Sequence, residues 1–494
     1  MTNFYTNVYY DFDSILITER IKDGSKNFRK EPFVPSLFIS SNKPTKYKSV
    51  QGSPLSEITF DSYSSYKEFK EKYSDVPGFQ IHGDINSEYL FINKEYGTDI
   101  NYDASKIDIM YIDIETSSEK GFPSIENPEE EVIAITVFSS LHGKAVFCLG
   151  TFTTQEDIKV FEFQEEETLL KKFIEYFSDN YPDVVSGWNI RFFDFPYLIK
   201  RIQVVLGKKQ AKMLSPWGIL KERFVTRNDR EEIAYDLVGI SMLDYYELYK
   251  TFTYVNQESY SLNHISYVEL GEKKLSYSEY ESFTEFYKKD FQRFIEYNIR
   301  DVYLVQKLEQ KLKLIELALA LSYSAGVNHQ DVFSQVRTWD VIIYNYLSKQ
   351  NIVVPPKKKG RKDEQYAGAY VKEPLVGKHN WVVSFDLNSL YPHLIMQYNI
   401  SPETITDEGL RGTVSPDGIL KNGLVSMSAI EEYKEKNLSV AANGTTYRKD
   451  IRGFLPELME TMYEERKLYK NKMIESKRNL EQVNAELKRR GLTK

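Results

Sequence analysis

Two acidic residues stand two positions apart at the end of a segment that is typical of a β-strand. Residues 107–115 have the sequence Ile-Asp-Ile-Met-Tyr-Ile-Asp-Ile-Glu. Alternate strand residues point to the same face, so Asp113 and Glu115 project together. Two carboxylates on an apolar face are costly to bury unless they are paired or bind a cation, and hard oxygen ligands suit Mg²⁺ and Mn²⁺. The pattern therefore predicts a metal site, with an ordinary pair of surface charges as the alternative.

Two more acidic residues lie where helices are expected to present them. Asp194 ends the segment Asn-Ile-Arg-Phe-Phe-Asp and precedes Pro196, which is typical of a helix start, so capping that helix is its alternative role. Tyr297 and Asp301 are four residues apart in a segment with helical periodicity, and they share one helix face. A solvated helical pair is the alternative there.

A further acidic residue ends a second predicted strand. Residues 381–386, Trp-Val-Val-Ser-Phe-Asp, favour a buried strand, and a turn and a helix follow. This order leaves the Asp386 carboxylate exposed at the end of a sheet. The alternative is an ordinary strand-to-helix junction in which the aspartate caps the helix.

Basic residues concentrate in the last part of the chain. A helix is predicted from Leu455 to about Leu487, and Arg466 and Lys470 lie one turn apart on it. Residues 466–494 hold ten Lys and Arg against three Glu, whereas the whole chain has a formal net charge of −8. Such cations either bind phosphate or form a solvated helical face.

The surrounding elements indicate several domains. At roughly 150 residues per domain, 494 residues suggest about three. The first hundred residues favour short strands, and residues 107–189 alternate strands with a helix, as in an α/β domain built on a mixed sheet. A hairpin is predicted at residues 224–237 with Asn228 near its tip, helices at residues 285–325, and a linker at residues 351–362.

The composition excludes several classes of protein. Apolar residues make up 41% and charged residues 28% of the chain, which argues against wholly disordered and collagen-like proteins. The single cysteine, Cys148, cannot form an intramolecular disulfide. The longest apolar stretch, residues 317–327, is shorter than the roughly 18 residues that indicate a membrane span.

The first three acidic motifs resemble, in their order and spacing, those of proofreading 3′→5′ exonuclease domains, which are D-x-E, N-x3-F-D and Y-x3-D. The resemblance implies that Asp113, Glu115, Asp194 and Asp301 hold two ions of Mg²⁺ or Mn²⁺. One ion would generate hydroxide and the other would stabilise the leaving oxygen. Tyr297 would orient the attacking water.

The segment around Asp386, with its D-x-x-S-L-Y-P sequence, resembles the first palm motif of family B DNA polymerases. The resemblance implies that Asp386 and the Leu387 carbonyl bind two catalytic metal ions. Tyr391 would lie under the incoming sugar and exclude a 2′-hydroxyl. The residues expected to contact the nucleotide are Leu387, Ser389, Leu390, Tyr391, Arg466 and Lys470, the last two on the first fingers helix.

Two further positions are expected to contact DNA. Tyr366-Ala-Gly368 looks like the family's Y-x-G-G/A motif, which touches the template strand, and a loop containing glycine is the alternative. Asn228 lies at the tip of a hairpin that, by resemblance, separates primer from template.

The whole chain is similar to the amino-terminal half of a family B DNA polymerase of T-even-type bacteriophages. The implied fold is a multidomain α/β protein with four parts. These are an amino-terminal α+β domain (residues 1–104, with 315–357 returning to it), a ribonuclease H-like α/β exonuclease domain (105–314), a partial palm (358–452) and the first fingers helix (453–494).

The family's K-x3-N-S-x-Y-G and Y-G-D-T-D-S motifs do not occur in the sequence. We therefore expect one subunit of a split phage replicative polymerase, in the cytoplasm of the infected bacterium. An artificially truncated polymerase is the alternative that gives the same sequence. A second polypeptide would supply the rest of the palm, fingers and thumb, and would bind the sliding clamp. Primer–template DNA and dNTPs would be the other partners. The alternatives are a regulator that binds its own messenger RNA and a stand-alone 3′→5′ exonuclease.

Overall fold

The structure is a computed structural model that describes residues 3–227, 230–357, 371–406 and 427–492. The described residues form two compact units, one drawn from the ranges 1–49 and 53–357 and the other from the ranges 50–52 and 358–494. Asn228, Tyr366 and Gly368, which were predicted to contact DNA, lie outside the described residues. The division of the chain into four domains stays a prediction.

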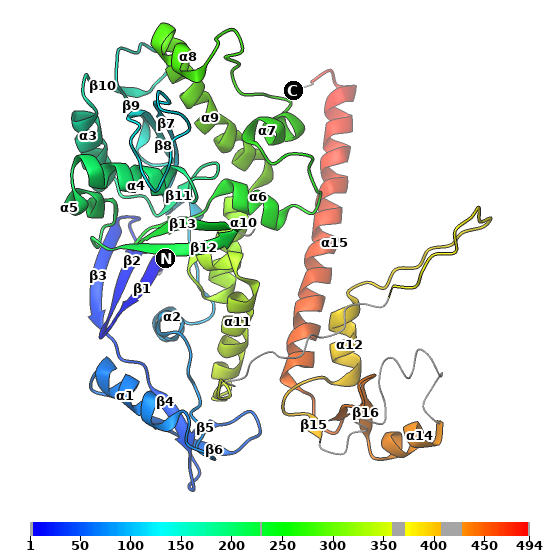
Figure 1. Cartoon of the computed structure of the whole chain (residues 1–494). Coiled ribbons are helices and arrows are strands. Elements are labelled where there is room, and N and C mark those ends of the chain that lie inside the picture. The colour runs from blue at the N-terminus through cyan, green and yellow to red at the C-terminus, as the bar shows by residue number, and fades with distance from the viewer. Residues whose placement is uncertain (1–2, 228–229, 358–370, 407–426, 493–494) are drawn as a thin grey trace. The chain divides into compact units, whose positions relative to one another are not determined.

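The first hundred residues of the first unit form two small antiparallel sheets and two helices (Figure 1). The sheets have the orders β1-β2-β3 and β4-β6-β5. The elements are β1 (Phe4–Asp11), β2 (Ser14–Arg20), β3 (Lys26–Pro32), β4 (Leu37–Ser40), β5 (Tyr47–Lys48), β6 (Pro54–Ile58), α1 (Tyr63–Tyr73) and α2 (Ser87–Tyr96). The short strands predicted for this segment are confirmed.

Residues far along the chain return to this leading segment. The Tyr5 hydroxyl donates a hydrogen bond to the Val327 carbonyl over 2.7 Å, and the Tyr323 hydroxyl donates to the Tyr5 carbonyl over 2.6 Å. The Asn328 side chain accepts from the Val8 N–H and donates to the Val8 carbonyl. All of these groups are buried, so the returning segment completes the core of the leading one.

A six-stranded mixed sheet follows, with the order β10-β9-β8-β7-β11-β14. Strands β7, β8 and β9 pair antiparallel, whereas β10 pairs parallel with β9, and β11 pairs parallel with both β7 and β14. The strands are β7 (Ile109–Thr116), β8 (Val132–Ser139), β9 (Gly143–Cys148), β10 (Lys159–Glu162), β11 (Val184–Ser186) and β14 (Ser241–Met242). The mixed α/β sheet predicted from the sequence is confirmed.

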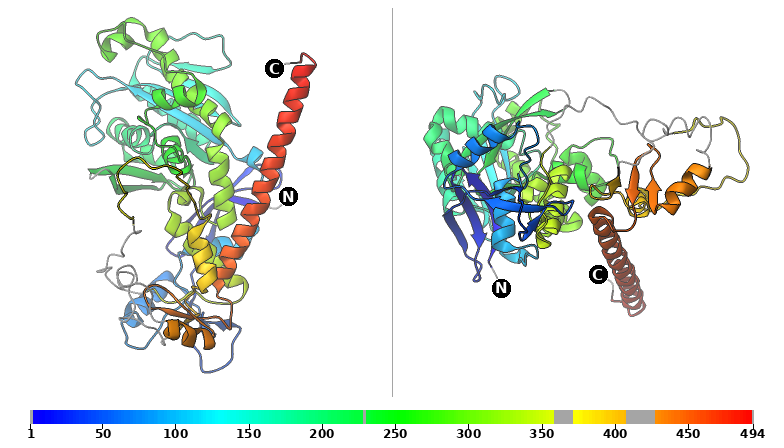
Figure 2. Two further views of the ribbon diagram at one scale, coloured as in Figure 1. Left: turned by 90° about the vertical axis from the view of Figure 1, so that its right-hand side faces the viewer. Right: turned by 90° about the horizontal axis from the view of Figure 1, so that it is seen from below.

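Helices cover both faces of this sheet (Figures 1 and 2). On one face, Met110, Ile112 and Ile114 of β7 pack in one core with α3 (Glu166–Asp179) and α4 (Asp194–Val205). On the other face, Tyr111 packs in a second core with α9 (Phe291–Leu312). Because Asp113 and Glu115 share the alternation of Tyr111, β7 directs both carboxylates toward the α9 face.

The rest of the first unit is mainly helical. The predicted hairpin is confirmed, with Arg227 of β12 directly opposite Arg230 of β13. The remaining elements are α5 (Lys208–Ala211), β12 (Leu220–Arg227), β13 (Arg230–Leu237), α6 (Tyr245–Phe252), α7 (Leu262–Leu270), α8 (Phe283–Lys289), α10 (Leu314–Ala325) and α11 (Gln335–Lys349).

The second unit is built around the predicted long helix, which is confirmed. Its elements are α12 (Leu390–Tyr398), β15 (Ile405–Thr406), α14 (Met427–Glu435), β16 (Leu438–Val440), β17 (Thr446–Arg448) and α15 (Phe454–Arg489), and the strands pair in the order β15-β17-β16. Helix α12 packs on α15, where the rings of His393 and Tyr463 have centroids 4.7 Å apart. Asn399 ends α12 with a φ of 58° and accepts a hydrogen bond from the Gly453 N–H, which joins the two helices.

The strand predicted at residues 381–386 is wrong. The segment is described but contains no strand, and Trp381, Val382, Val383 and Phe385 are each at least 71% exposed. A strand exists only through backbone hydrogen bonds to a neighbouring strand, and no described residue provides that neighbour. Apolar side chains alone therefore predicted an element that nothing in the described chain pairs with.

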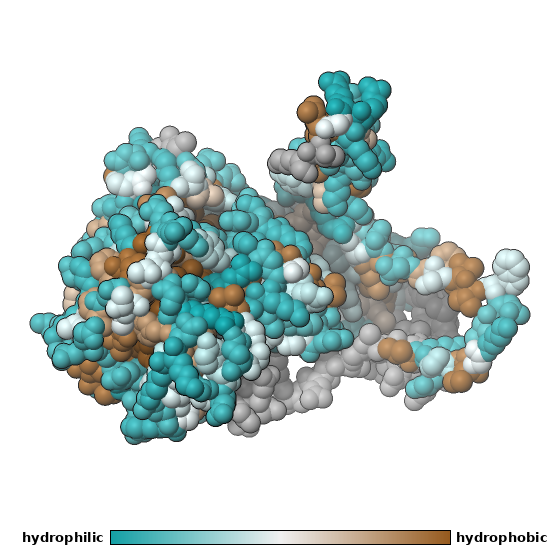
Figure 3. All heavy atoms as spheres, turned by 90° about the horizontal axis from the view of Figure 1, so that it is seen from above, coloured by the Kyte–Doolittle hydropathy of each residue, from teal (hydrophilic) through white to brown (hydrophobic). Residues whose placement is uncertain are grey.

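Within the described part of the chain, we find no helix that combines the length and the apolar character needed to cross a membrane. The face shown in Figure 3 is largely hydrophilic, with hydrophobic side chains in separate areas.

Candidate active site

Three of the predicted acidic residues meet between β7 and α9. One carboxylate oxygen each of Asp113, Glu115 and Asp301 lies within 4.8 Å of the other two. Asp113 and Glu115 are partly exposed, whereas Asp301 is only 2% exposed. Three hard oxygen donors in one partly open cluster match the ligands that Mg²⁺ and Mn²⁺ prefer. The structure thus brings together residues that are 188 positions apart along the chain.

Asp194 lies next to this cluster but outside the group of three. It is the first residue of α4, and its Oδ1 accepts a hydrogen bond from the Ile114 N–H over 3.1 Å. The alternative of a helix cap is wrong, because Phe193 occupies the cap position and the Asp194 side chain binds β7 instead. The loop that leads into α4 begins at Gly187, directly after β11. A Cβ at this position would lie 2.4 Å from the Ile112 carbonyl oxygen, so only glycine lets this loop approach β7.

A buried carboxylate that the sequence analysis missed, Asp244, holds this loop. Its two oxygens accept hydrogen bonds from the backbone N–H groups of Asn189, Arg191 and Tyr246, each over 2.9 Å. Asp244 therefore fixes the backbone that leads into Asp194. The local signal was an aspartate directly after the apolar end of a strand, where it begins α6.

A lysine that the sequence analysis also missed, Lys274, reaches into the acidic cluster. Its Nζ lies 2.5 Å from Asp301 Oδ2 and donates to the Tyr297 hydroxyl over 3.0 Å. Lys274 comes from the loop between α7 and α8, where no local pattern distinguishes it from Lys273. Tyr297 and Asp301 share one face of α9 as predicted, and Lys274 joins them there.

In the absence of metal, the surroundings of the cluster disfavour the ionised form of its carboxylates. Burial raises the pKa of Asp113 well above its ordinary value, and the charges of Asp194 and Asp301 raise it further. Burial and the charge of Asp301 raise the pKa of Glu115 to about 8. Burial alone would lower the pKa of Lys274, but Asp301 and Tyr297 hold it above its ordinary value.

The residues present fit divalent metal ions. Asp301 Oδ1 is buried and has no hydrogen-bond partner among the described residues. An unpartnered buried carboxylate oxygen is costly, and a metal ion at that oxygen would remove the cost. The donor set is entirely carboxylate oxygen, which suits Mg²⁺ and Mn²⁺ better than softer metals.

We expect the metal-free chain to lose stability as pH rises from about 4.3 to about 8. A Glu in an unfolded chain has a pKa of about 4.3. Folded Glu115 has a pKa of about 8, so the unfolded chain releases this proton first and becomes favoured as pH rises. Melting temperatures in EDTA between pH 5.5 and 8.5 measure this. Glu115→Gln should reduce the dependence of melting temperature on pH, whereas Glu167→Gln, at an exposed position, should not. Equal slopes in the unmodified chain and both variants would contradict the prediction.

The residues predicted for nucleotide addition lie in the second unit. Asp386, Leu387 and Tyr391 are exposed where α12 begins, and Ser389 there has a φ of 53°. Arg466 and Lys470 are exposed on α15. Among the described residues, no hydrogen bond or ion pair joins these cations to Asp386, and their roles in nucleotide addition stay predictions.

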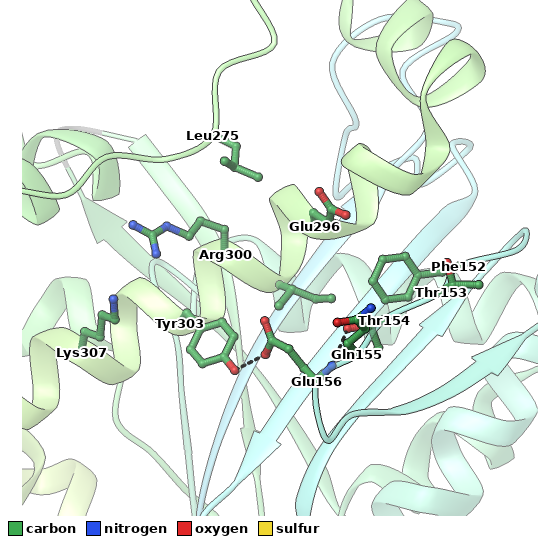
Figure 4. A pocket seen from close by; sticks show the side chains of 11 residues that line it. Phe152, Thr153, Thr154, Gln155, Glu156, Leu275, Glu296, Arg300, Tyr303 and Lys307 are labelled. Carbon is green, nitrogen blue, oxygen red and sulfur yellow. Dashed lines mark hydrogen bonds between the residues drawn. The ribbon is translucent and has the colours of Figure 1, made fainter.

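A pocket of about 850 Å³ is lined by residues of α9 and by residues 152–156 (Figure 4). Glu296, Arg300 and Lys307 of α9 line it together with Leu275, the residue after Lys274. Arg300 and Lys307 are both paired with Glu272, and none of the four acidic site residues lines the pocket. The pocket is therefore not part of the candidate site.

Comparison with known proteins identifies the family. A sequence model described as "DNA polymerase family B, exonuclease domain" matches residues 62–265, which include Asp113, Glu115 and Asp194. A second, described as "DNA polymerase family B", matches residues 333–489, which include Asp386 and Arg466. Together the two matches cover more than half of the chain. The chain belongs to DNA polymerase family B.

Phage polymerases are similar to this family B chain over almost its whole length. A DNA-directed DNA polymerase of Escherichia phage RB69 is 32% identical over 97% of the chain and 55% of the relative. That of Enterobacteria phage T4 is 28% identical over 98% of the chain and 55% of the relative. The DNA polymerase delta catalytic subunit of Schizosaccharomyces pombe is 27% identical over 60% of the chain and 29% of the relative. The chain spans about half the length of the phage relatives.

Proposed function

We propose that this chain is the part of a phage DNA-directed DNA polymerase that carries a complete 3′→5′ exonuclease site. The observation that supports it best is the three-carboxylate cluster of Asp113, Glu115 and Asp301, with Asp194 beside it. Hydrolysis of a phosphodiester is hindered by the substrate's negative charge. Carboxylates alone would repel that charge, whereas carboxylates that hold divalent metal neutralise it.

The four acidic residues would hold two metal ions, which supply a nucleophilic hydroxide and stabilise the leaving oxygen. The chain's own residues do the positioning. Because the Tyr297 hydroxyl accepts from Lys274, its own proton stays available to orient a water or a phosphate oxygen. The Lys274 ammonium adds a fixed positive charge where an anionic phosphate would lie.

Aromatic rings next to the carboxylates support a single-stranded substrate. Phe193 directly precedes Asp194, and its ring centroid lies 5.9 Å from that of Phe122 and 5.9 Å from that of Tyr197. The Phe122 side chain is 88% exposed. Exposed aromatic rings stack on bases with little regard to sequence, as an enzyme that removes any terminal nucleotide requires.

The test is degradation of single-stranded DNA by the isolated chain. With a label at the 5′ end, Mg²⁺ or Mn²⁺ should produce a ladder of fragments shortened from the 3′ end, and EDTA should abolish it. A substrate blocked by a 3′-phosphorothioate linkage is the matched control and should be degraded much more slowly. Degradation that continues in EDTA, or that starts at the 5′ end, would contradict the proposal.

We expect Lys274→Met to slow this degradation about a hundredfold, which is typical for removal of one preorganised charge that stabilises the transition state. The same variant should need less Mn²⁺ for half-maximal activity, because the ammonium no longer repels metal from Asp301. The neighbour Lys273 packs its Nζ over the Tyr267 ring, so Lys273→Met is the matched control and should act like the unmodified chain. Loss of rate with a higher Mn²⁺ requirement would contradict this role.

For nucleotide addition we propose that the chain acts with the rest of a family B polymerase, supplied as a second polypeptide. Asp386 and the Leu387 carbonyl would bind two Mg²⁺ or Mn²⁺ ions, and Ser389, Leu390, Tyr391, Arg466 and Lys470 would contact the dNTP. Primer–template DNA would bind both units, with Tyr366, Gly368 and Asn228 among its contacts, and the sliding clamp would bind the second polypeptide. The proposed location is the cytoplasm of an infected bacterium.

The observation that favours this pairing is the exposed apolar segment at residues 381–386, whose side chains the second polypeptide would cover. A stand-alone exonuclease remains the second candidate, because every carboxylate that exonuclease chemistry requires lies within the first unit.

A further inference from the structure

A chain of buried hydrogen bonds leads to the carboxylate of Asp113. The Thr136 hydroxyl donates to Asn298 Oδ1, and Asn298 Nδ2 donates to Asp113 Oδ2 over 2.7 Å. The Thr136 and Asn298 side chains are fully buried. Asn298 occupies an unspecified position of the Y-x3-D motif and Thr136 lies outside the acidic motifs. Neither holds a group that could itself react.

The fold places these three residues together through two elements. Thr136 of β8 is the direct cross-strand partner of Asp113 of β7, so their side chains lie on the same face of the sheet. Helix α9 packs on that face and carries Asn298 between Tyr297 and Asp301. The helix that supplies one acidic ligand therefore also supplies a hydrogen-bond donor to another.

The chemistry of these three side chains determines which group donates and which accepts in each hydrogen bond. The ionised form of Asp113, which would bind metal, only accepts, so it requires the NH₂ end of the Asn298 amide. The oxygen of the amide then faces Thr136, whose hydroxyl must donate to it. A flipped amide would set its oxygen against the carboxylate oxygen, and the two would repel each other. Thr136 thus determines which end of Asn298 meets Asp113.

We propose that Asn298, oriented by Thr136, is a positioning residue that holds Asp113 in the orientation required for metal binding. The inference rests on the proposed exonuclease function and adds to it two residues that act through Asp113. Partners that hydrogen-bond to metal ligands orient them, and their loss typically weakens metal binding about 10- to 100-fold.

The test is direct Mn²⁺ binding to the full chain without DNA, measured from the electron paramagnetic resonance signal of free Mn²⁺. Thr136→Val keeps the shape of the side chain and removes only the hydroxyl, and we expect the dissociation constant to rise about tenfold. Thr136→Ser retains the hydroxyl, so its Mn²⁺ dissociation constant should stay close to that of the unmodified chain. Asn298→Ala removes the donor itself and should weaken binding at least as much as Thr136→Val.

The matched control is Ser139→Ala on the same strand. Ser139 is also buried, and its hydroxyl donates over 2.6 Å to Asp108, a carboxylate outside the site. It should lower the melting temperature to a similar extent and leave Mn²⁺ binding unchanged. If Thr136→Val does not fold, Asn298→Ala, which leaves the strand intact, takes its place.

Two results would overturn the inference. One is Mn²⁺ binding by folded Thr136→Val and Asn298→Ala that equals binding by the unmodified chain. The other is equal weakening by Ser139→Ala, which would indicate a general loss of stability. Failure of the proposed exonuclease function would be seen in a separate measurement. The unmodified chain would then degrade no DNA, regardless of how tightly its variants bind Mn²⁺.

Discussion

Replacing both Asp113 and Glu115 by alanine is expected to abolish 3′→5′ degradation of single-stranded DNA, with a loss of at least about a thousandfold. The two residues supply two of the three carboxylates that lie within 4.8 Å of one another. Stabilisation of charge by metal is worth several kcal/mol, and each 1.4 kcal/mol changes a rate about tenfold. DNA binding should change little, because the phosphate contacts that position DNA are separate from the metal chemistry.

The same double variant gives a second measurement that separates lost chemistry from lost folding. Burial and the charges of the neighbouring Asp194 and Asp301 raise the pKa values of Asp113 and Glu115 and destabilise the metal-free site. Their removal should therefore raise the melting temperature in EDTA at pH 8 and eliminate its response to Mn²⁺. An inactive variant with a lowered melting temperature would not support the assignment, and an active variant would exclude it.

The matched control is an acidic pair on the surface of the same compact unit. Glu167 and Glu175 are exposed on α3 and pair only with the neighbouring lysines Lys171 and Lys172. Exposed pairs of this kind contribute little to stability. The double alanine variant at these positions should keep its activity and its response to Mn²⁺.

The acidic cluster was predictable because its members belong to regular elements. The period of two along β7 assigns Asp113 and Glu115 to one face, and the helical spacing of Tyr297 and Asp301 assigns both to one face of α9. Lys274 and Asp244 were missed, although one is paired with Asp301 and the other holds the loop before Asp194. Loop positions have no periodicity, so only tertiary structure determines what such side chains contact.

The strand predicted at residues 381–386 was wrong for a different reason from the one that hid Lys274 and Asp244. Its apolar sequence correctly indicates side chains that favour burial, but a strand also needs a partner and a covering layer. The sequence of a segment specifies whether its side chains favour burial. Other parts of a protein supply the partner strand and the covering layer. The same reasoning explains why α15, whose backbone hydrogen bonds are internal, was predicted from residues 455–487 and extends over Phe454–Arg489.

The exposed segment before Asp386 leads to the last prediction, which concerns nucleotide addition. Alone, this chain should not extend a primer, because Asp386 is one of the two carboxylates that hold the metals in family B polymerases and the Y-G-D-T-D-S motif is not in its sequence. Addition of a polypeptide that carries the remaining palm, fingers and thumb should restore extension. Asp386→Ala should then reduce extension at least about a thousandfold, by the same reasoning about metal-held charge.

The matched control for Asp386→Ala is Glu460→Ala, which removes an exposed acid in the same unit that pairs with Arg452. It should leave extension unchanged. Because Asp386 lies in one compact unit and Asp113 in the other, each active-site variant should also leave the other activity intact. Extension by this chain alone, at a rate equal to that of the mixture, would contradict the proposed pairing. Loss of degradation in Asp386→Ala would show instead that the two sites are not independent.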